Sequence, residues 1–171
     1  MKADVCQLGL DQRKVNVLAK EYCDAIHLEE KPVIISHHML SGLKEGQAKM
    51  SKSDPDSAIF MEDTRKDVER KIKKSYCPPE QVANNPILDY CNSIIFPSFG
   101  RLTILKKPEF GGPKTYTSYE ELKADYAAGQ LHPGDLKPAV TLAINNLLQP
   151  VRDHFENDPY ARRLLETIKQ W

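Results

Sequence analysis

The residues with the clearest chemical use lie in one short string, GQAKMSKSD, at positions 46–54. Lys49 and Lys52 stand three positions apart and alternate with the hydroxyl-bearing Ser51 and Ser53. Ammonium and hydroxyl groups on a loop can stabilise the charge that builds up on a leaving pyrophosphate, and loss of one such donor typically costs about 2.7–4 kcal/mol. This chemistry depends on positioning and charge and needs no nucleophile. The string therefore predicts a phosphate-binding loop, and the plain alternative is a solvated basic loop.

The residues before this loop predict an α/β region. One buried strand is expected to end over Val5–Leu8, broken by Gly9, and a second buried strand is expected over Val33–Ile35. Between them a helix is expected from Asp11, as its N-cap, to about Cys23. Its apolar positions at helical spacing are Val15, Leu18, Ala19 and Tyr22. Residues 41–57 are rich in Gly, Ser and Lys, so they are expected to form a loop that follows the second strand.

The rest of the chain predicts a mostly helical region with one small hairpin. The expected helices cover residues 64–75, 86–96 and 118–128, a stretch after the turn at 132–135 that Asp135 can cap, and a stretch from near Pro159. Residues 101–106 and 114–117 are expected to pair around Phe110-Gly111-Gly112, and Ser118 to Glu121 has the sequence of a capping box. The predicted fold is therefore α/β followed by mostly α, with domains at residues 1–62 and 63–171.

Composition and charge limit the classes of function. The 171 residues include 24 basic and 24 acidic side chains, so the chain lacks the strong positive charge of a protein that coats RNA without specificity. The four cysteines form no Cys-x-x-Cys pair and have no zinc-ligand spacing to a His, which favours free thiols in a reducing cytosol and no bound metal. No apolar run approaches the roughly 20 residues of a membrane span, and neither a signal nor a transit peptide is expected.

Four strings in order resemble tyrosyl-tRNA synthetases of the archaeal and eukaryotic cytosolic type. They are CQLGLDQRKVNVLAKEYC, KPVIISHHMLSGLKEGQAKMSKSD, KKPEFGGPKTYTSYEEL, and LHPGDLKPAV with LLQPVRDHF. A five-letter motif recurs by chance, whereas four strings at the family's spacing do not. The resemblance covers essentially the whole chain. It implies the C-terminal half of such an enzyme, which is the end of a Rossmann-like class I catalytic domain with the KMSKS loop, followed by a helical anticodon-binding domain.

The resemblance implies a role for each matching residue in the ATP and adenylate site. Gly9 would let the backbone approach the adenosine, and Asp11 would accept a hydrogen bond from a ribose hydroxyl unless it only caps the helix. Gln12 would bind the tyrosine carboxyl or the α-phosphate region. Met39 and Leu40 would lie beside the adenine, with ordinary core packing as the alternative. The loop would supply the catalytic groups and a further adenylate contact, through Lys49, Met50, Ser51, Lys52 and Ser53.

The resemblance also implies two contacts with tRNA. Arg13 and Lys14 would meet the end of the acceptor stem, unless they only form a solvated helix face. Phe110 would stack on an unpaired anticodon base, because such a base needs an aromatic partner and hydrogen bonds to its edge. His132 and Asp135 flank a Pro-Gly turn, and Asp135 could accept from the guanine that a tyrosine tRNA presents, as well as cap a helix.

Other family motifs are expected but missing from the chain. The His-Ile-Gly-His-type motif and the Tyr-Gln-Asp tyrosine pocket, which belong to the N-terminal half of such enzymes, are absent from the 171 residues. The chain is therefore expected to be a fragment, engineered or from a truncated gene model, that is inactive alone. The full-length protein is expected to be a cytoplasmic homodimer that uses ATP, with Mg²⁺, to join tyrosine to tRNA(Tyr).

Two other functions remain open from the sequence. A tryptophanyl-tRNA synthetase fragment would share the fold and the loop, although the Phe-Gly-Gly and His-Pro-Gly-Asp strings favour tyrosine. A non-catalytic tRNA-binding half of a double-length pseudodimer would be a binding module rather than an enzyme. The intact KMSKS string argues against decay of this half.

Overall fold

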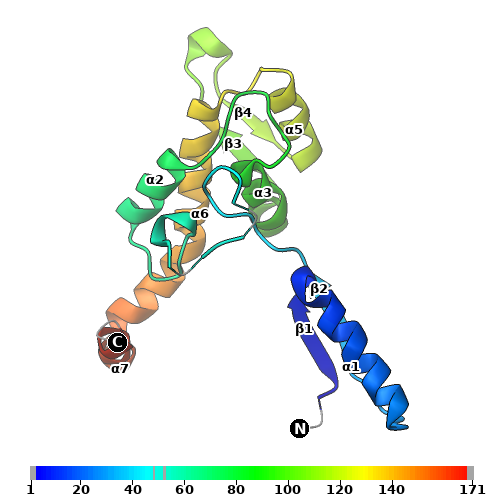
Figure 1. Cartoon of the computed structure of the whole chain (residues 1–171). Coiled ribbons are helices and arrows are strands. Elements are labelled where there is room, and N and C mark those ends of the chain that lie inside the picture. The colour runs from blue at the N-terminus through cyan, green and yellow to red at the C-terminus, as the bar shows by residue number, and fades with distance from the viewer. Residues whose placement is uncertain (1–2, 48, 52, 169–171) are drawn as a thin grey trace. The chain divides into compact units, whose positions relative to one another are not determined.

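A computed structural model describes residues 3–47, 49–51 and 53–168 of the chain (Figure 1). The backbone packs as two compact units, Met1–Met39 and Leu40–Trp171. The first unit is α/β and the second is mainly helical, and the 41–57 loop packs with the second. The order of α/β followed by mostly α agrees with the predicted fold. The domain boundary near residue 62 stays a prediction, because compact packing alone does not define a functional domain.

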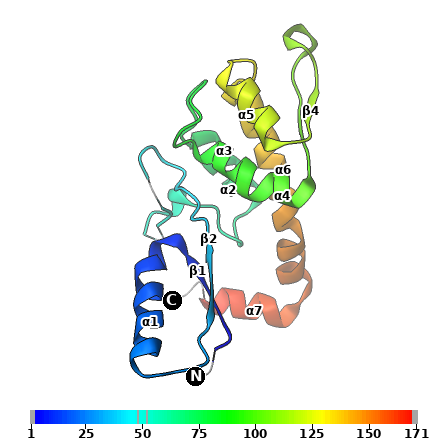
Figure 2. The ribbon, with the colours of Figure 1, turned by 90° about the vertical axis from the view of Figure 1, so that its right-hand side faces the viewer.

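The first unit contains two parallel strands and the helix that connects them. β1 (Val5–Gly9) pairs with β2 (Val33–His37), with Val5 opposite Val33 and Gly9 opposite His37. A single 3₁₀ turn at Leu10–Gln12 leads into α1 (Arg13–Ala25), which runs alongside the strands (Figure 2). Parallel strands need a crossover of this kind. Both predicted strands and the predicted helix are therefore confirmed.

The predicted burial of this unit is wrong. Val33 of β2 exposes 60% of its surface, and Leu18 and Tyr22 on the predicted apolar face of α1 expose 63% and 64%. The residue that α1 buries is instead the polar Asn16. Among the described residues, β1 and β2 pair only with each other. Since a two-stranded sheet with one helix has few neighbours, its apolar side chains have little to pack against.

The predicted N-cap of α1 is also wrong. The helix begins at Arg13, and Asp11 lies inside the preceding 3₁₀ turn, where its carboxylate accepts a 3.3 Å hydrogen bond from Gln12 Nε2. The turn inserts three residues between the strand and the helix, so Asp11 sits too early in the chain to cap α1. Its carboxylate therefore remains available for another partner.

The second unit is organised around one long helix, α6 (Pro133–Asn157), which extends through it (Figure 1). The predicted apolar face ends near Leu148, but the helix continues past Pro150 to Asn157. The other elements are α2 (Arg65–Lys74), α3 (Pro86–Tyr90), α4 (Phe96–Phe99), β3 (Leu102–Ile104), β4 (Lys114–Tyr116), α5 (Tyr119–Ala127) and α7 (Pro159–Ile168). The predicted helices and hairpin are all present.

The core of this unit forms where α2, α3 and the hairpin meet α6. Val68 and Ile72 of α2 are buried, as their i, i+4 spacing predicts, and so are Leu136 and Val140 of α6. The hairpin adds Tyr116, which is fully buried. In α2 and α6 the apolar periodicity therefore predicts the core correctly, whereas in α7 Leu164 and Ile168 expose 47% and 62% of their surfaces.

Two details of the helical predictions need correction. Ser118 Oγ accepts from the Glu121 amide at 3.3 Å, but the Glu121 carboxylate pairs with Lys114 Nζ at 3.3 Å, so only half of the expected capping box exists. The predicted helix over 86–96 is α-helical at Pro86–Tyr90, π-helical at Cys91–Ile95, and α-helical again in α4. A π-helical turn adds one residue to the ring of each hydrogen bond, which apolar spacing does not reveal.

The cap of α6 also differs from the prediction. His132, rather than Asp135, is the N-cap, and its Nδ1 accepts from the Gly134 amide at 3.0 Å. Pro133 occupies the first helical position, where its fixed φ favours a helix start. The helix therefore begins before Asp135 can cap it.

Within the described part of the chain, no helix is long and apolar enough to cross a membrane. The same residues contain no group of three or more His, Cys, Asp or Glu side chains placed to hold a metal ion. All four cysteines are free thiols, as predicted.

Candidate functional site

The KMSKS loop is anchored by a buried serine that follows it. The Ser57 side chain is fully buried, and its Oγ accepts from the Ser51 amide and donates to the Ser51 carbonyl, both at 3.0 Å. The Ser57 carbonyl accepts from the Leu43 amide at 2.9 Å. One hydroxyl thus fixes both backbone groups of a central loop residue. Sequence reasoning missed Ser57, because a serine after a turn carries no signal of burial.

The chemical groups of the loop are arranged around that anchor. The hydroxyls of Ser51 and Ser53 lie 2.8 Å apart, and Lys49 is exposed. Met50 is half-buried and packs against the core of the second unit. Lys52, the second predicted charge carrier, lies outside the described residues. Among the described residues of the loop, Lys49 and Ser53 are therefore exposed and Ser51 is half-buried, while Met50 packs against the core.

Three ion pairs surround the loop, and sequence reasoning identified none of them. Lys44 Nζ binds both oxygens of Asp54, at 2.7 and 2.6 Å. Arg70 of α2 donates to Asp56 at 2.5 Å, and this guanidinium lowers the pKa of the Asp56 carboxyl. Further along, the buried pair of Lys71 with Asp63 fixes the chain just before α2. Acidic residues after the loop, with a lysine or arginine eight to fourteen residues away in the chain, were the available signal.

Three residues of the predicted adenosine site come together in the first unit. A Cβ atom added to Gly9 would lie 2.2 Å from Met39 Sδ and 2.7 Å from Asp11 Oδ1. A Cβ does not approach other atoms so closely, so a side chain at this position would displace the Met39 and Asp11 side chains from where they lie. Gly9 ends β1 and Asp11 lies in the turn that follows it, at the carboxyl end of a parallel strand, where open α/β sheets bind ligands. Leu40, half-buried, begins the second unit.

Arg13 and Lys14 form the first turn of α1, directly after Gln12. Both side chains are exposed, as the prediction of an acceptor-stem contact requires. Arg13 also lines a small hollow of about 300 Å³ together with Asn16, Lys20 and Ser36. The pair therefore lies on the surface of α1 and follows closely in the chain on Gly9 and Asp11, two residues of the predicted adenosine site.

Phe110 lies at the tip of the β3–β4 hairpin and exposes 67% of its surface. The two glycines after it both have left-handed backbones, with φ of 92° and 69°, which is why glycine is needed at the tip. The base of the hairpin is fixed to α5, because Asp125 accepts from Lys114 Nζ at 2.7 Å and from the Tyr116 hydroxyl at 2.8 Å. Burial and this carboxylate both raise the pKa of Tyr116. A rigid base thus presents an exposed aromatic ring.

His132 and Asp135 lie at the start of α6. Because His132 Nδ1 accepts from Gly134, the Nε2 atom of a neutral imidazole carries the proton and is a donor. The Asp135 carboxylate is free of the capping role that sequence reasoning gave it. Lys106 Nζ, beyond β3, donates to the Gln130 carbonyl at 2.5 Å, which ties the hairpin to this turn. A hollow of about 660 Å³ borders the turn and is lined by Pro133, Gly134, Arg65, Lys73 and Lys137, among others.

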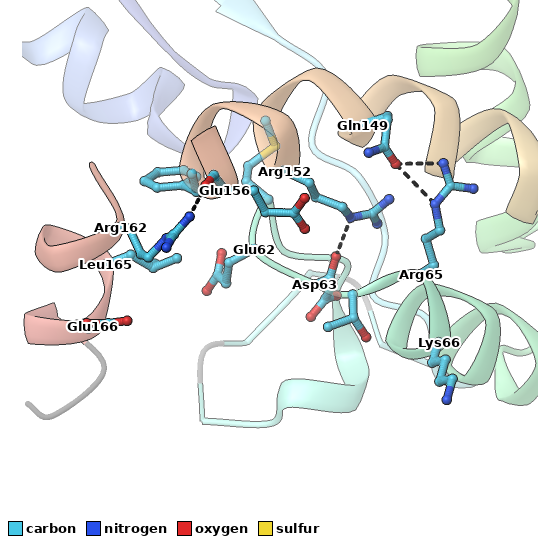
Figure 3. A pocket seen from close by; sticks show the side chains of 13 residues that line it. Glu62, Asp63, Arg65, Lys66, Gln149, Arg152, Glu156, Arg162, Leu165 and Glu166 are labelled. Carbon is cyan, nitrogen blue, oxygen red and sulfur yellow. Dashed lines mark hydrogen bonds between the residues drawn. The ribbon is translucent and has the colours of Figure 1, made fainter. Parts of the chain in front are cut away.

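A third hollow, of about 670 Å³, is lined by none of the predicted site residues. It lies between the start of α2, the C-terminal half of α6, and α7 (Figure 3). Arg152 crosses it and donates from Nε to the Asp63 carbonyl at 2.9 Å, while Arg65 binds Gln149. Burial and the nearby Arg65 lower the pKa of Arg152. Its arginines are thus engaged in holding helices together.

Known proteins share this arrangement of loop, strands and helices. The family model for tRNA synthetases class I (W and Y) matches residues 1–149. Tyrosine–tRNA ligase 1, cytoplasmic, of Arabidopsis thaliana is 58% identical over 171 residues, which are 100% of this chain and 44% of that protein. Tyrosine–tRNA ligase of Pyrococcus horikoshii is 40% identical over 192 residues, 96% of this chain and 51% of that protein. The chain thus spans about half the length of the curated relatives it matches.

Solved structures of tRNA synthetases resemble this chain as well. The tyrosyl-tRNA synthetase of Leishmania major in complex with tyrosinol has a TM-score of 0.85 and 49% identity, over 98% of this chain and 33% of that one. A tryptophanyl-tRNA synthetase from Giardia lamblia has a TM-score of 0.62 at 22% identity, over 85% of this chain and 34% of that one, and so shares the fold alone. At high identity the similarity is therefore to tyrosine enzymes. The chain belongs to the class I tRNA synthetases, in the family of the tryptophan and tyrosine enzymes.

Proposed function

We propose that this chain is the part of a tyrosine–tRNA ligase that supplies the KMSKS loop and recognises the anticodon. It corresponds to the end of the catalytic domain followed by a helical anticodon-binding domain, with the boundary near residue 62. The observation that carries the proposal is the loop itself. Its backbone is fixed at Ser51 by the buried Ser57, while Lys49 and Ser53 are exposed and the Ser53 hydroxyl lies 2.8 Å from that of Ser51.

The reaction is the activation of tyrosine by ATP, followed by transfer of the tyrosyl group to tRNA(Tyr). Lys49, with Lys52, stabilises the charge that develops on pyrophosphate as the carboxylate of tyrosine attacks the α-phosphate. The two serines donate hydrogen bonds to the same oxygens. ATP brings its own Mg²⁺, and the chemistry assigned to this chain is electrostatic stabilisation and positioning.

The nucleoside of ATP is assigned to the residues after β1 and β2. Asp11 accepts from a ribose hydroxyl, which agrees with a carboxylate that caps no helix. Gly9 and Met39 form the floor beside the adenine, with Leu40 and Met50 as further contacts. Gln12 binds the tyrosine carboxyl or the α-phosphate region.

The tRNA is assigned to two surfaces. Arg13 and Lys14 hold the end of the acceptor stem. Phe110 stacks on an anticodon base, and His132 and Asp135 bind the edge of that base. Two observations support this assignment: the Phe110 ring is exposed, and the Asp135 carboxylate caps no helix. The cations around the adjoining hollow suit the phosphates of an RNA loop.

The complete protein is proposed to be a cytoplasmic homodimer. The His-Ile-Gly-His-type motif and the tyrosine pocket lie outside the 171 residues, so the chain alone is expected to have no tyrosine-dependent ATP–pyrophosphate exchange. This expectation fails if the isolated chain exchanges at a rate near that of a complete enzyme.

A segment exchange tests the proposed function. The matching 44% of the Arabidopsis thaliana enzyme is replaced by this chain, and tyrosine-dependent exchange is measured. We expect an active chimera, and we expect Lys49→Ala to lose about 100-fold or more in rate, the typical effect of removing one transition-state donor. Lys66→Ala, an exposed lysine of α2, serves as the matched control and should leave the rate unchanged. An inactive but folded chimera would refute the proposal.

A further inference from the structure

A third lysine lies beside the KMSKS loop. Lys44 Nζ binds Oδ1 and Oδ2 of Asp54, at 2.7 and 2.6 Å, across ten residues of sequence. The pair joins the two ends of the segment that contains Lys49, Ser51 and Ser53. The Lys44 ammonium therefore lies at the neck of the loop, on the same short segment as the groups assigned to the phosphates.

The backbone on both sides fixes this position. Gln47 donates to the Lys44 carbonyl at 3.3 Å and Gly42 donates to the Gln47 carbonyl at 3.0 Å, so Lys44 begins a tight turn. On the other side, the Asp54 amide donates to the Ser51 carbonyl at 3.2 Å. Asp54 follows Ser53 directly, and consecutive Cα atoms are about 3.8 Å apart. The residue whose carboxylate holds Lys44 is thus the next one in the chain after the hydroxyl pair of Ser51 and Ser53.

The Lys44–Asp54 ion pair is too exposed to be a strong structural link. Its side chains are 52% and 35% exposed, and exposed pairs stabilise proteins by only about 0–1 kcal/mol. The buried Lys71–Asp63 pair, with side chains 3% and 10% exposed, is a structural link of another kind. A polyphosphate carries more charge and more acceptor oxygens than one carboxylate, so it can displace Asp54 from Lys44 at little cost.

We propose that Lys44 is a third phosphate-binding lysine of this loop, which Asp54 holds in place and releases to the polyphosphate of ATP or to pyrophosphate. The inference rests on the proposed function, since it adds a residue to the same site. It predicts opposite effects for the two partners. Removal of Lys44 weakens phosphate binding, whereas removal of the Asp54 charge frees the lysine and strengthens binding.

The test is a calorimetric titration of the 171-residue chain with sodium tripolyphosphate at low salt. Relative to the native chain, we expect Lys44→Met to bind about three- to tenfold more weakly and Asp54→Asn about three- to tenfold more tightly. If both variants bind more weakly, the pair only shapes the loop and the inference is wrong. Unchanged affinity in both variants refutes it equally.

Two further variants separate a released lysine from a change in local charge. Glu45→Gln removes the same charge in the turn next to Lys44, and it should change affinity less than Asp54→Asn does. In the double variant Lys44→Met/Asp54→Asn, the gain from Asp54→Asn should disappear, because the lysine that it frees is gone. A gain from Glu45→Gln equal to that from Asp54→Asn, or a gain that survives in the double variant, overturns the inference.

The segment-exchange chimera distinguishes this inference from the proposed function. If the native chimera lacks exchange activity but the tripolyphosphate results hold, the site stands and the proposed reaction fails. If the chimera is active and Lys44→Met leaves its KM for ATP and for pyrophosphate unchanged, the reaction stands and the role of Lys44 fails.

Discussion

At the scale of single residues, a buried network holds the chain just after the KMSKS loop. Asp63 accepts from Lys71 Nζ at 2.9 and 2.6 Å and from the Phe60 amide at 2.9 Å. The Lys71 ammonium also lies 4.6 Å from the centre of the Phe60 ring. A carboxylate and an ammonium at this depth are tolerated only because each satisfies the other. The loop therefore ends at a rigid point.

The first residue-scale prediction concerns this pair. Lys71→Met should lower the free energy of unfolding of the chain by about 3–5 kcal/mol, because it leaves the Asp63 carboxylate buried without a counter-charge. Urea titration measures the change. Lys66→Met, an exposed lysine of the same helix, should change stability by less than about 0.5 kcal/mol. The double variant Lys71→Met/Asp63→Leu should recover most of the loss, and a double variant as unstable as the single one would argue against this account.

The second residue-scale prediction concerns high pH. Burial raises the pKa of Tyr90 to about 12, partly offset by a hydrogen bond with the Ile59 backbone. Because the pKa in the folded chain exceeds the value of about 10 in the unfolded chain, the contribution of Tyr90 is complete below pH 10 and is lost as the pH rises through about 12. The unfolding free energy should fall by up to about 1.4 kcal/mol per pH unit for this group.

Tyr90→Phe provides the control for that measurement. Without an ionisable phenol at this position, urea titrations from about pH 9 upward should show a shallower fall in stability than the native chain shows. Other buried acids share the alkaline transition, since burial also raises the pKa of Cys91 and Tyr126. The slopes of the two proteins should therefore differ without either becoming zero. Equal slopes would show that Tyr90 ionises as freely in the folded chain as in the unfolded one.

At the scale of elements, the C-terminal part of α6 is fixed to the segment that leads from the loop into α2. Arg152 donates from Nε to the Asp63 carbonyl at 2.9 Å and from its guanidinium to Asn145 Oδ1 at 2.9 Å. The planar guanidinium presents separate N–H donors to both acceptors at once. These contacts hold the part of α6 that contains Pro150, where the missing amide removes one backbone hydrogen bond of the helix.

The helices of the second unit show which kinds of sequence signal are sufficient to predict an element and its buried face. Pro86 after Asn85 predicts a helix start, and Asn85 Oδ1 does accept from the amides of Ile87 and Leu88. Val68 and Ile72 predict a buried face correctly. The cap at His132 was missed because its bond to Gly134 depends on the rotamer of a side chain that rarely caps helices. Local spacing thus identified the elements, while their ends depended on individual side-chain bonds.

At the scale of the whole molecule, the sequence predicts which residues belong to the candidate site. It does not predict the residues that hold them in place. KMSKS is a contiguous signal, so Lys49, Ser51 and Ser53 could be chosen from the string alone. Ser57, Arg70 and the Lys44–Asp54 pair could not, because their roles arise from contacts between segments that only folding brings together. The predicted roles in adenosine, acceptor-stem and anticodon binding stay predictions.

The two units differ in how much of their apolar surface is buried. In the second unit, a continuous core includes fully buried residues such as Ile87, Leu122 and Leu136. In the first unit, Val5 of β1, Val33 of β2 and Leu18 of α1 expose 56%, 60% and 63% of their surfaces. Because burial of apolar surface is the main stabilising term in folding, the first unit by itself has little to stabilise it.

Hydrogen exchange tests this difference directly. We expect the amides of β1, α1 and β2 in the isolated chain to exchange through local opening, much faster than those of α6, whose opening requires unfolding of the second unit. In the segment-exchange chimera, the same amides of the first unit should gain protection, because the remainder of the synthetase can cover the exposed faces of Leu18 and Tyr22 on α1 and of Val33 on β2. The amides of α6 serve as the internal control and should change little. Uniformly strong protection of residues 3–40 in the isolated chain would show that two strands and one helix suffice, and that the exposed apolar faces need no partner.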